Sequence, residues 1–410
     1  MPALALAVVV ILGASALVID RLSLDVAKHE LRNAAEAAAL AAARELACDD
    51  RLRSDFDPAA LKMKACFAAA RIANENFVAG QPLFLDTSTN RDVRFGRLTT
   101  DPESGEKLFE EVDGRDEPMT VAVNARRTTD RDSAVPLPFR MLYAVTDADV
   151  VAIAEASLDF HVRGLRPSDQ SPIPTLPLAI LAQTLPGQDS SPETSSATDG
   201  SQQQLGQPSP SGQPTASSWM RDVEQRNGLD RFGYDASTGT VTQAADGIPE
   251  ITLRTASRSG DPTSNAFVLN LVGDLTMDQL RRHVSEGWSA DDLQPLGGEL
   301  LFDGGSLMLA GMRGVDSNAL ATPLRTVLGQ SRVVFLYDRE VGDARASAAS
   351  LHISGMVAGR VMSVREISSS ECEIVFQPSV MATRSAVTAA NGSEAVTQKN
   401  KYVANLRLTN

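Results

Sequence analysis

The sequence predicts an α+β protein in which one long N-terminal helix carries two folded bodies. Three observations lead to this fold class. Residues 3–48 have a helical composition that no Pro interrupts, short β-branched or alternating runs recur later, and a segment rich in Ser, Pro and Gln separates those runs into two groups. We therefore expect a transmembrane and amphipathic helix, a helical hairpin plus antiparallel sheet, a disordered linker, and a second strand-rich α+β domain.

The opening helix has an apolar first part and a charged second part. Ala3–Ile19 contains no charged residue, and about 17 apolar residues is the lower limit for a helix that crosses a bilayer. From Asp20 onward the sequence is charged and rich in Ala, the strongest helix former. We expect residues 1–20 to be a transmembrane anchor. The alternative is a cleaved signal peptide, because Ala14-Ser15-Ala16 resembles a cleavage site. Both interpretations place the body outside the cytoplasm.

A second helix is expected over about 57–78, packed as a hairpin on the first. Asp57 suits the N-cap, and Pro58 suits the first helical position, where its missing N–H does no harm. One cysteine falls on each arm of this hairpin, Cys48 and Cys66. A disulfide between them would close a short loop and stabilise the fold by about 3 kcal/mol. The alternative is a pair of buried free thiols.

The remainder of the first body, which spans residues 21–166, is expected to form a sheet. Val121, Val123 and Ala125 alternate with other side chains, which is typical of a sheet with one buried face. The expected strands are 82–86, 92–98, 118–127 and 149–160, with a short helical piece over 136–145.

Residues 167–218 are expected to be a linker between the two bodies. The part after Gln188 offers almost nothing to bury, so we expect disorder there. The apolar island Ile173–Ala182 differs from its surroundings. It is too short to span a bilayer, and we expect it to dock on one of the bodies.

The second body is expected over residues 219–388. Thr276 and Gln279 form a capping-box pattern that opens a helix, and Asp303-Gly304-Gly305 is typical of a hairpin turn. Further strands are expected over 332–338, 351–364 and 372–378, where Cys372 fills a strand core. The tail, residues 389–410, is polar and is expected to be loose.

Motifs of catalytic or metal-binding chemistry are missing from the sequence. The four histidines are scattered, and there is no zinc-protease motif, no phosphate-binding loop and no nucleophile elbow. The net charge of −14 argues against a nucleic-acid partner, since a basic patch is needed to neutralise phosphates. We therefore assign no catalytic, cofactor-binding or metal-binding residue and expect no cofactor and no enzymatic activity.

The first helix carries a family resemblance. Residues 16–46 read ALVIDRLSLDVAKHELRNAAEAAALAAAREL, and this stretch is similar to the N-terminal signature of the TadE/TadG-like family of tight-adherence (Flp) pilus assembly proteins. Arg32 stands where Gln is common, and Asp is common at the position of Glu36. The residues that match the family motif are Asp20, Leu31, Ala34, Ala35, Glu36, Ala38 and Leu40.

The resemblance implies a membrane-anchored, non-enzymatic structural or assembly component of a tight-adherence pilus system. It implies a single-pass protein of the bacterial cytoplasmic membrane, with its body on the extracytoplasmic side. Its partners would be other pilus-assembly and secretion components, and the lipid bilayer through residues 3–19. Two alternatives stay open: an anchored surface-binding module unrelated to pili, and an ordinary anchor joined to an Ala-rich core helix.

Overall fold

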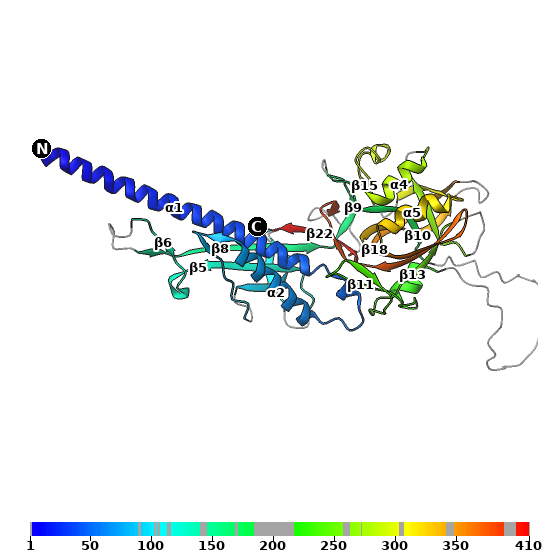
Figure 1. Cartoon of the computed structure of the whole chain (residues 1–410), viewed down its shortest axis with the longest axis horizontal. Coiled ribbons are helices and arrows are strands. Elements are labelled where there is room, and N and C mark those ends of the chain that lie inside the picture. Colours follow the sequence, from blue (N-terminus) through cyan, green and yellow to red (C-terminus); the bar gives the residue numbers. More distant parts are fainter. Residues whose placement is uncertain are drawn as a thin grey trace, which may run out of the picture.

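The computed structural model shows an elongated molecule in which a long helix projects from two bodies placed end to end (Figure 1). The residues that the structure describes are 2–88, 92–101, 104, 107–112, 116–139, 146–168, 171–183, 217–256, 263–271, 273–302, 307–341, 348–388 and 399–409.

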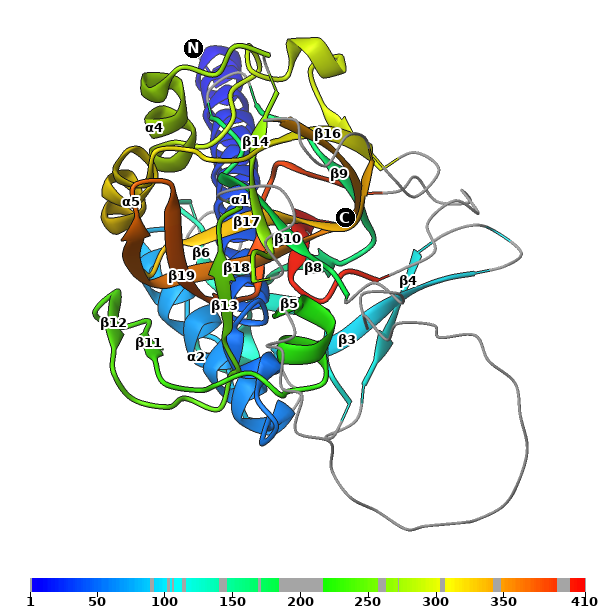
Figure 2. The same ribbon diagram turned by 90° about the vertical axis from the view of Figure 1, so that its right-hand side faces the viewer.

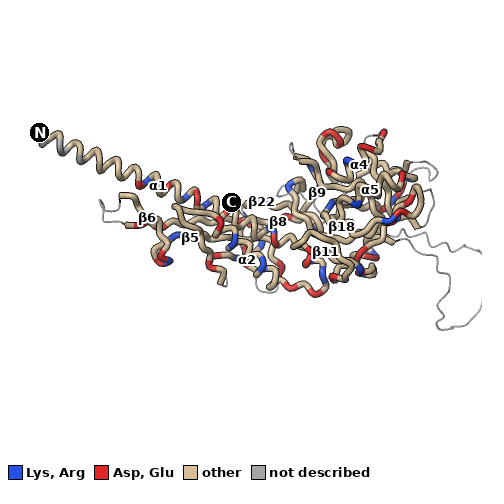
Figure 3. Tube along the Cα trace, viewed as in Figure 1, with Lys and Arg blue, Asp and Glu red and all other residues tan. Residues whose placement is uncertain are grey.

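Helix α1 (Pro2–Glu45) is continuous, as the sequence predicts. Its first half extends beyond the first body, and its second half lies on that body (Figure 1). Figure 3 shows acidic and basic residues on α1 only from Asp20 onward, and residues 2–19 contain neither kind. Among the described residues no helix combines the length and the apolar character needed to cross a membrane. Anchoring by residues 1–20 therefore stays a prediction.

The first body consists of α1, α2 (Pro58–Glu75) and a six-stranded sheet. Asp57 caps α2 as expected, since its side chain accepts a hydrogen bond from the backbone N–H of Ala59. The strands of the sheet, in spatial order, are β20 (Met381–Ala382), β22 (Val403–Leu408), β8 (Val150–Asp159), β5 (Thr120–Arg127), β3 (Val93–Thr100) and β4 (Lys107–Glu111). All pairs are antiparallel except β20 and β22.

The predicted loose tail over 389–410 is wrong for its last part. Residues Val403–Leu408 form β22, which pairs with β8 near the middle of the first sheet. Val403 and Ala404 are fully buried, while the side chains that follow are partly exposed. The strand is too short for its alternation to stand out in a polar segment, because its stability comes from pairing with residues far away in sequence. Residues 389–398 lie outside the described part of the chain.

The second body is built on a seven-stranded sheet that closes on itself. The strands, in order, are β13 (Ile251–Arg254), β19 (Glu371–Pro378), β18 (Ala348–Ser368), β16 (Leu307–Met312), β14 (Ala266–Asn270), β10 (Thr175–Leu181) and β17 (Ser331–Val341). Because β17 also pairs with β18, five of these strands form a closed ring around one core, which Figure 2 views from its end. Helices α4 (Met277–Ser285) and α5 (Ser317–Thr326) contact each other beside this ring. The Thr276 capping box is confirmed.

The apolar island of the expected linker is a central strand of the second body. All seven residues of β10 are buried, between β14 on one side and β17 on the other. The backbone N–H of Met220 donates to the carbonyl of Ala182 at 2.9 Å. Both ends of the Ser/Pro/Gln-rich segment therefore meet in one body, and the prediction that residues 167–218 connect two bodies is wrong. The disorder expected after Gln188 falls on residues 184–216, outside the described residues.

The chain passes between the bodies at two other places. It leaves the first sheet after β8 and returns to it at β20, so the second body is an insertion within the first. A three-stranded sheet of β15 (Leu300–Leu301), β9 (Val162–Leu165) and β21 (Ala386–Thr388) forms at this junction. The hairpin turn expected around 303–305 lies outside the described residues. The strands on either side of it do not pair with each other, since β15 pairs with β9 and β16 pairs with β14 and β18.

Short strand pairs complete the described structure. They are β1 (Phe77–Val78) with β2 (Gln81–Pro82), β6 (Val135–Pro136) with β7 (Asp147–Ala148), and β11 (Gly233–Asp235) with β12 (Thr240–Thr242). The helical piece expected over 136–145 begins instead in strand β6, and its residues 140–145 lie outside the described part.

Direct polar contacts join the two bodies. Asp49, in the connection between α1 and α2, accepts a hydrogen bond from the backbone N–H of Val380 at 2.7 Å. Its other carboxylate oxygen forms an ion pair at 2.9 Å with Arg360 of β18, whose guanidinium stacks over the ring of Tyr234. These contacts and the double chain crossing fix the second body against the first.

Candidate functional site

The second half of α1 is buried between α2 and the first sheet. Helix α1 contacts α2, β8 and β5, and the side chains that face these elements are small. Small side chains allow a close approach of backbones, so the Ala-rich composition fits a helix that is covered on two sides. The α1 residues of this cluster are Ala27, Leu31, Ala34, Ala35, Ala38, Ala39, Ala42 and Ala43, Leu46 follows the end of the helix, and the α2 residues are Leu61, Ala65, Ala69 and Ala73.

Most of the predicted family-motif residues have a packing position here. Leu31, Ala34, Ala35 and Ala38 are buried, and Leu40 is half-buried against the same cluster. Glu36 differs, because its carboxylate forms a 2.8 Å ion pair with Arg32 one turn away on the helix surface. Exposed pairs of this kind contribute little to stability.

Asp20 lies at the point where α1 leaves the first body. Its side chain is only 5% exposed, and Oδ1 accepts a hydrogen bond at 3.0 Å from the backbone N–H of Phe139. Its Oδ2 atom is buried and has no hydrogen-bond partner among the described residues. The motif aspartate therefore ties the chain after β6 to the helix and helps to set the direction in which the apolar half projects.

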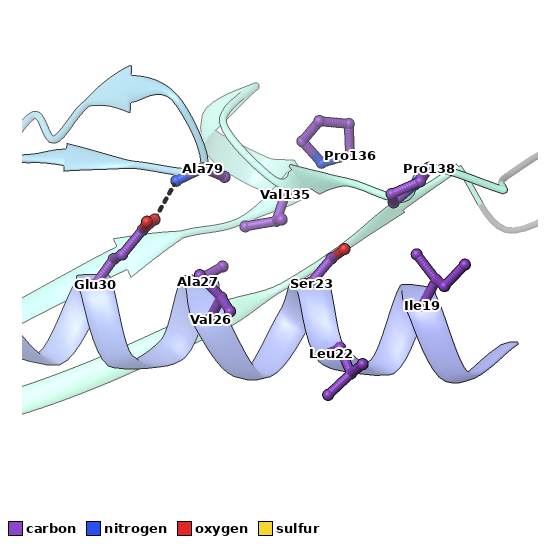
Figure 4. Close-up of a pocket in the computed structure, with 10 residues that line it drawn as sticks. All are labelled: Ile19, Leu22, Ser23, Val26, Ala27, Glu30, Ala79, Val135, Pro136 and Pro138. Carbon is purple, nitrogen blue, oxygen red and sulfur yellow. Dashed lines mark hydrogen bonds between the residues drawn. The ribbon is translucent and has the colours of Figure 1, made fainter. Parts of the chain in front are cut away.

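An open groove runs beside α1 at the same point, between the helix and the segment around β6 (Figure 4). Its volume is about 390 Å³. At one end, Glu30 Oε2 accepts a hydrogen bond at 2.8 Å from the backbone N–H of Ala79. The residues that line it are Ile19, Leu22, Ser23, Val26, Ala27, Glu30, Ala79, Val135, Pro136 and Pro138. This lining can hold an apolar group by contact and offers no nucleophile paired with a base.

The projecting half of α1 presents large apolar side chains that no other described residue covers. Those at least two-fifths exposed are Leu4, Val8, Val10, Ile11, Leu12, Leu17, Val18 and Ile19. A single exposed apolar residue is ordinary, but a continuous apolar helix surface marks contact with a membrane or another protein.

Cys48 and Cys66 are free thiols, and the hairpin is held together without a disulfide between them. Both are half-buried at the edge of the α1–α2 cluster. Burial raises the pKa of Cys48 to about 11, with the charge of Asp50 acting in the same direction, and burial also raises the pKa of Cys66. Cys372 is buried in β19, where its Sγ donates to the carbonyl of Ser317.

A buried polar cluster at the end of α4 was not anticipated from the sequence. The carboxylate of Asp292 accepts hydrogen bonds from Arg282, from Ser289 and from the His283 ring, at 2.5 to 3.0 Å. Burial acts to raise the pKa of Asp292, but the hydrogen bonds from Arg282 and Ser289 outweigh it and hold that pKa well below its usual range. Because both carboxylate oxygens of Asp292 accept hydrogen bonds from groups of the cluster, we interpret it as structural support for α4.

Metal binding has no visible basis in the described part of the chain, where no three His, Cys, Asp or Glu side chains gather as a ligand set. Two of the histidines each contact an aspartate and belong to no larger group of possible metal ligands in the described part of the chain. His283 faces Asp292, and His352 faces Asp338 at 2.6 Å.

Comparison with known proteins places the family match on α1. Residues 1–45 match the family model described as "Putative Flp pilus-assembly TadE/G-like". No curated protein and no solved structure gives a significant match. The N-terminal region is therefore TadE/G-like, as its motif predicts, and this indicates a role related to Flp pilus assembly and an association with the cell envelope.

Proposed function

We propose that the protein is a membrane-anchored, non-enzymatic structural component of a tight-adherence (Flp-type) pilus assembly system. One observation carries the proposal. The helix that matches the family is also the element whose apolar first part projects from the folded body with its side chains exposed. The Ala side chains of its second half pack against α2 and the sheet of the first body. A helix with this division can hold a body at a membrane or within an assembly.

In this proposal residues 3–19 insert into the cytoplasmic membrane and both bodies lie on the extracytoplasmic side. Seventeen residues at 1.5 Å each give a length of roughly 26 Å, slightly less than the hydrocarbon thickness of about 30 Å. A small mismatch of this kind is met by local thinning of the bilayer. Asp20 then lies at the boundary, where its bond to Phe139 orients the body relative to the inserted segment.

The proposed partners are other components of pilus assembly and secretion. The groove and the exposed face of α1 offer apolar contact, which suits association with another helix or with lipid more than the turnover of a substrate. The rigid junction between the bodies supports a structural role, because a force or an orientation applied to one body reaches the other.

The experiment compares two single substitutions in the natural host. Leu12→Arg places a charge in the proposed inserted segment, which costs about 2.5–3.5 kcal/mol at the centre of a spanning helix. Leu12→Ile is the matched control. We expect Leu12→Arg to deplete the protein from the membrane fraction and to reduce piliation, whereas Leu12→Ile leaves both unchanged. Normal piliation after deletion of the whole gene would refute the pilus role, and recovery of the intact parent chain in the cytosol would refute the anchor.

A further inference from the structure

One short segment of the first body reaches the apolar half of α1. Residues 135–139, which we call the β6 segment, begin in β6 and run alongside α1 toward its N-terminal half (Figure 4). Pro138 lies toward the Ile19 end of the groove, and the backbone N–H of Phe139 donates to Asp20 at 3.0 Å. The β6 segment therefore meets α1 where the uncharged part of the helix ends.

The composition and the hydrogen bonds of the β6 segment suit an apolar environment. The segment contains no charged residue. Two of residues 136–139 are Pro, which has no backbone N–H. The other two, Leu137 and Phe139, donate theirs to the Thr146 carbonyl at 3.1 Å and to Asp20. An unpaired N–H costs several kcal/mol in hydrocarbon, and these four residues bring none with them.

The first body also withdraws the first charge of α1 from the surface. Asp20 is only 5% exposed, so its carboxylate would not meet lipid. The next large apolar side chain of α1, Leu22, is 59% exposed and lines the groove. An apolar surface that runs from Ala3 to Leu22 has 20 residues and a length of roughly 30 Å, which matches the hydrocarbon thickness of about 30 Å. Residues 3–19 alone are shorter than this thickness.

Charged residues beside the groove indicate how deep a membrane contact can go. The Arg21 side chain is 71% exposed, and its long apolar stem allows the guanidinium to reach lipid phosphates from the edge of the hydrocarbon. Asp25 forms an ion pair with Arg21 at 3.5 Å. Asp147 is exposed and lies across from Pro136 in the β6–β7 pair. Because exposed carboxylates belong in the aqueous layer, Pro136 fits the level of the headgroups, and Pro138 lies deeper.

We propose that the β6 segment is a second membrane contact, in which acyl chains of phospholipids fill the groove between Pro138 and residues 19–22 of α1. Continuity identifies the occupant, because the groove begins at Ile19, the last residue of the proposed inserted segment. Among the described residues that line the groove only Glu30 is charged, and it lies at the far end, bonded to Ala79. This inference rests on the proposed function, since it requires the anchor to be in the membrane.

Photocrosslinking of the full chain in lipid vesicles tests the second contact. The vesicles consist of dioleoyl phosphatidylcholine with a minor fraction of the same lipid carrying a diazirine in one acyl chain. After trypsin digestion, peptide 1–21 reports on the anchor, 22–28 on the α1 side of the groove and 132–140 on the β6 segment. Peptide 65–71 is the control, because its Phe67 is 63% exposed on α2. We expect both groove peptides to be labelled roughly five times more than the control, since the diazirine labels groups that lie in the hydrocarbon.

The labelling pattern separates failure of this inference from failure of the anchor. Strong labelling of peptide 1–21, with peptide 132–140 at the level of the control, would overturn the second contact and leave the anchor in place. Absence of labelling in both peptides would overturn both proposals. Labelling of 132–140 only by a diazirine on the lipid headgroup would place the β6 segment above the hydrocarbon and would also overturn the acyl-chain contact.

A substitution in the β6 segment provides a second measurement. Pro138→Asp places a carboxylate at the proposed contact and should reduce labelling of peptide 132–140 roughly threefold or more, because a carboxylate is costly in hydrocarbon. Peptide 1–21 should keep its labelling. Ala59→Asp adds the same charge on α2 and should change neither peptide. Both positions are exposed, so both variants should keep the Tm of the parent chain. Unchanged labelling of peptide 132–140 in a folded Pro138→Asp variant would overturn the contact.

Discussion

Close packing of α2 on α1 predicts that adding volume to a buried alanine destabilises the first body. Ala73 is fully buried in the α1–α2 cluster, whereas Ala59 is exposed on the same helix. Each lies in a terminal turn of α2. Leu ranks just below Ala as a helix former, so Ala73→Leu and Ala59→Leu change helix propensity by a similar small amount. They differ chiefly in whether the added carbons enter the packed layer.

The expected cost of Ala73→Leu is about 1–3 kcal/mol, because overpacking forces neighbouring side chains and backbone to move. Ala59→Leu should stay within about 0.5 kcal/mol of the parent chain. At about 2–4 °C per kcal/mol for a body of this size, the first variant should lower Tm by roughly 2–12 °C. The assay is thermal unfolding of the full chain in detergent, followed by circular dichroism. Equal Tm values for the two variants would refute the close helix packing.

Three further predictions concern the tail, the thiols and the buried aspartate. Removing residues 389–410 should expose the edge of β8 and lower Tm markedly, whereas a loose tail would leave Tm unchanged. Without reductant, iodoacetamide at pH 8 should modify Cys48 and Cys66 slowly in the folded chain, because only about one Cys48 thiol in a thousand is ionised at a pKa of about 11. Mass spectrometry of the unfolded chain should then show both modified, and a disulfide would leave both unmodified. Asp292→Asn should cost about 1–3 kcal/mol at pH 7. The folded-state pKa of Asp292 is depressed, so its contribution is fully present above about pH 4 and is lost on acidification. The difference between variant and parent in urea titrations should therefore shrink below pH 4.

Local patterns in the sequence predict helices α1, α2 and α4 and the six longest strands of this fold, β3, β5, β8, β17, β18 and β19. The unbroken α1, the Asp57 cap of α2 and the Thr276 capping box each depend on residues within a few positions of one another. The order of small residues in α1 also located the family match. These features require no knowledge of distant contacts, so one sequence is enough to identify them.

Features that depend on distant contacts could not be predicted in the same way. The hydrogen bond from Phe139 to Asp20 joins residues 119 positions apart, and nothing near Asp20 in sequence indicates it. Strand β22 is recognisable only once β8 is beside it. The ring of the second body closes through β10, which a polar segment separates from the other strands. Composition marked that segment as a linker, but composition does not show where its two ends meet.

Both ends of the Ser/Pro/Gln-rich segment lie in the second body, and this argues against a surface-binding module on a flexible linker. A module that recognises a ligand across a flexible linker needs a body that folds and moves independently of the first. Here the second body includes β10, and the first sheet includes β22, so a cut at residue 219 divides both cores. Removing residues 219–410 should therefore unfold the remainder and would not separate adhesion from anchoring. The chain crosses the junction between the bodies twice, and the ion pair of Asp49 with Arg360 joins them there. A molecule bound to the second body would therefore be held at a fixed place relative to α1. If the second body binds a ligand, α1 determines where that ligand is held.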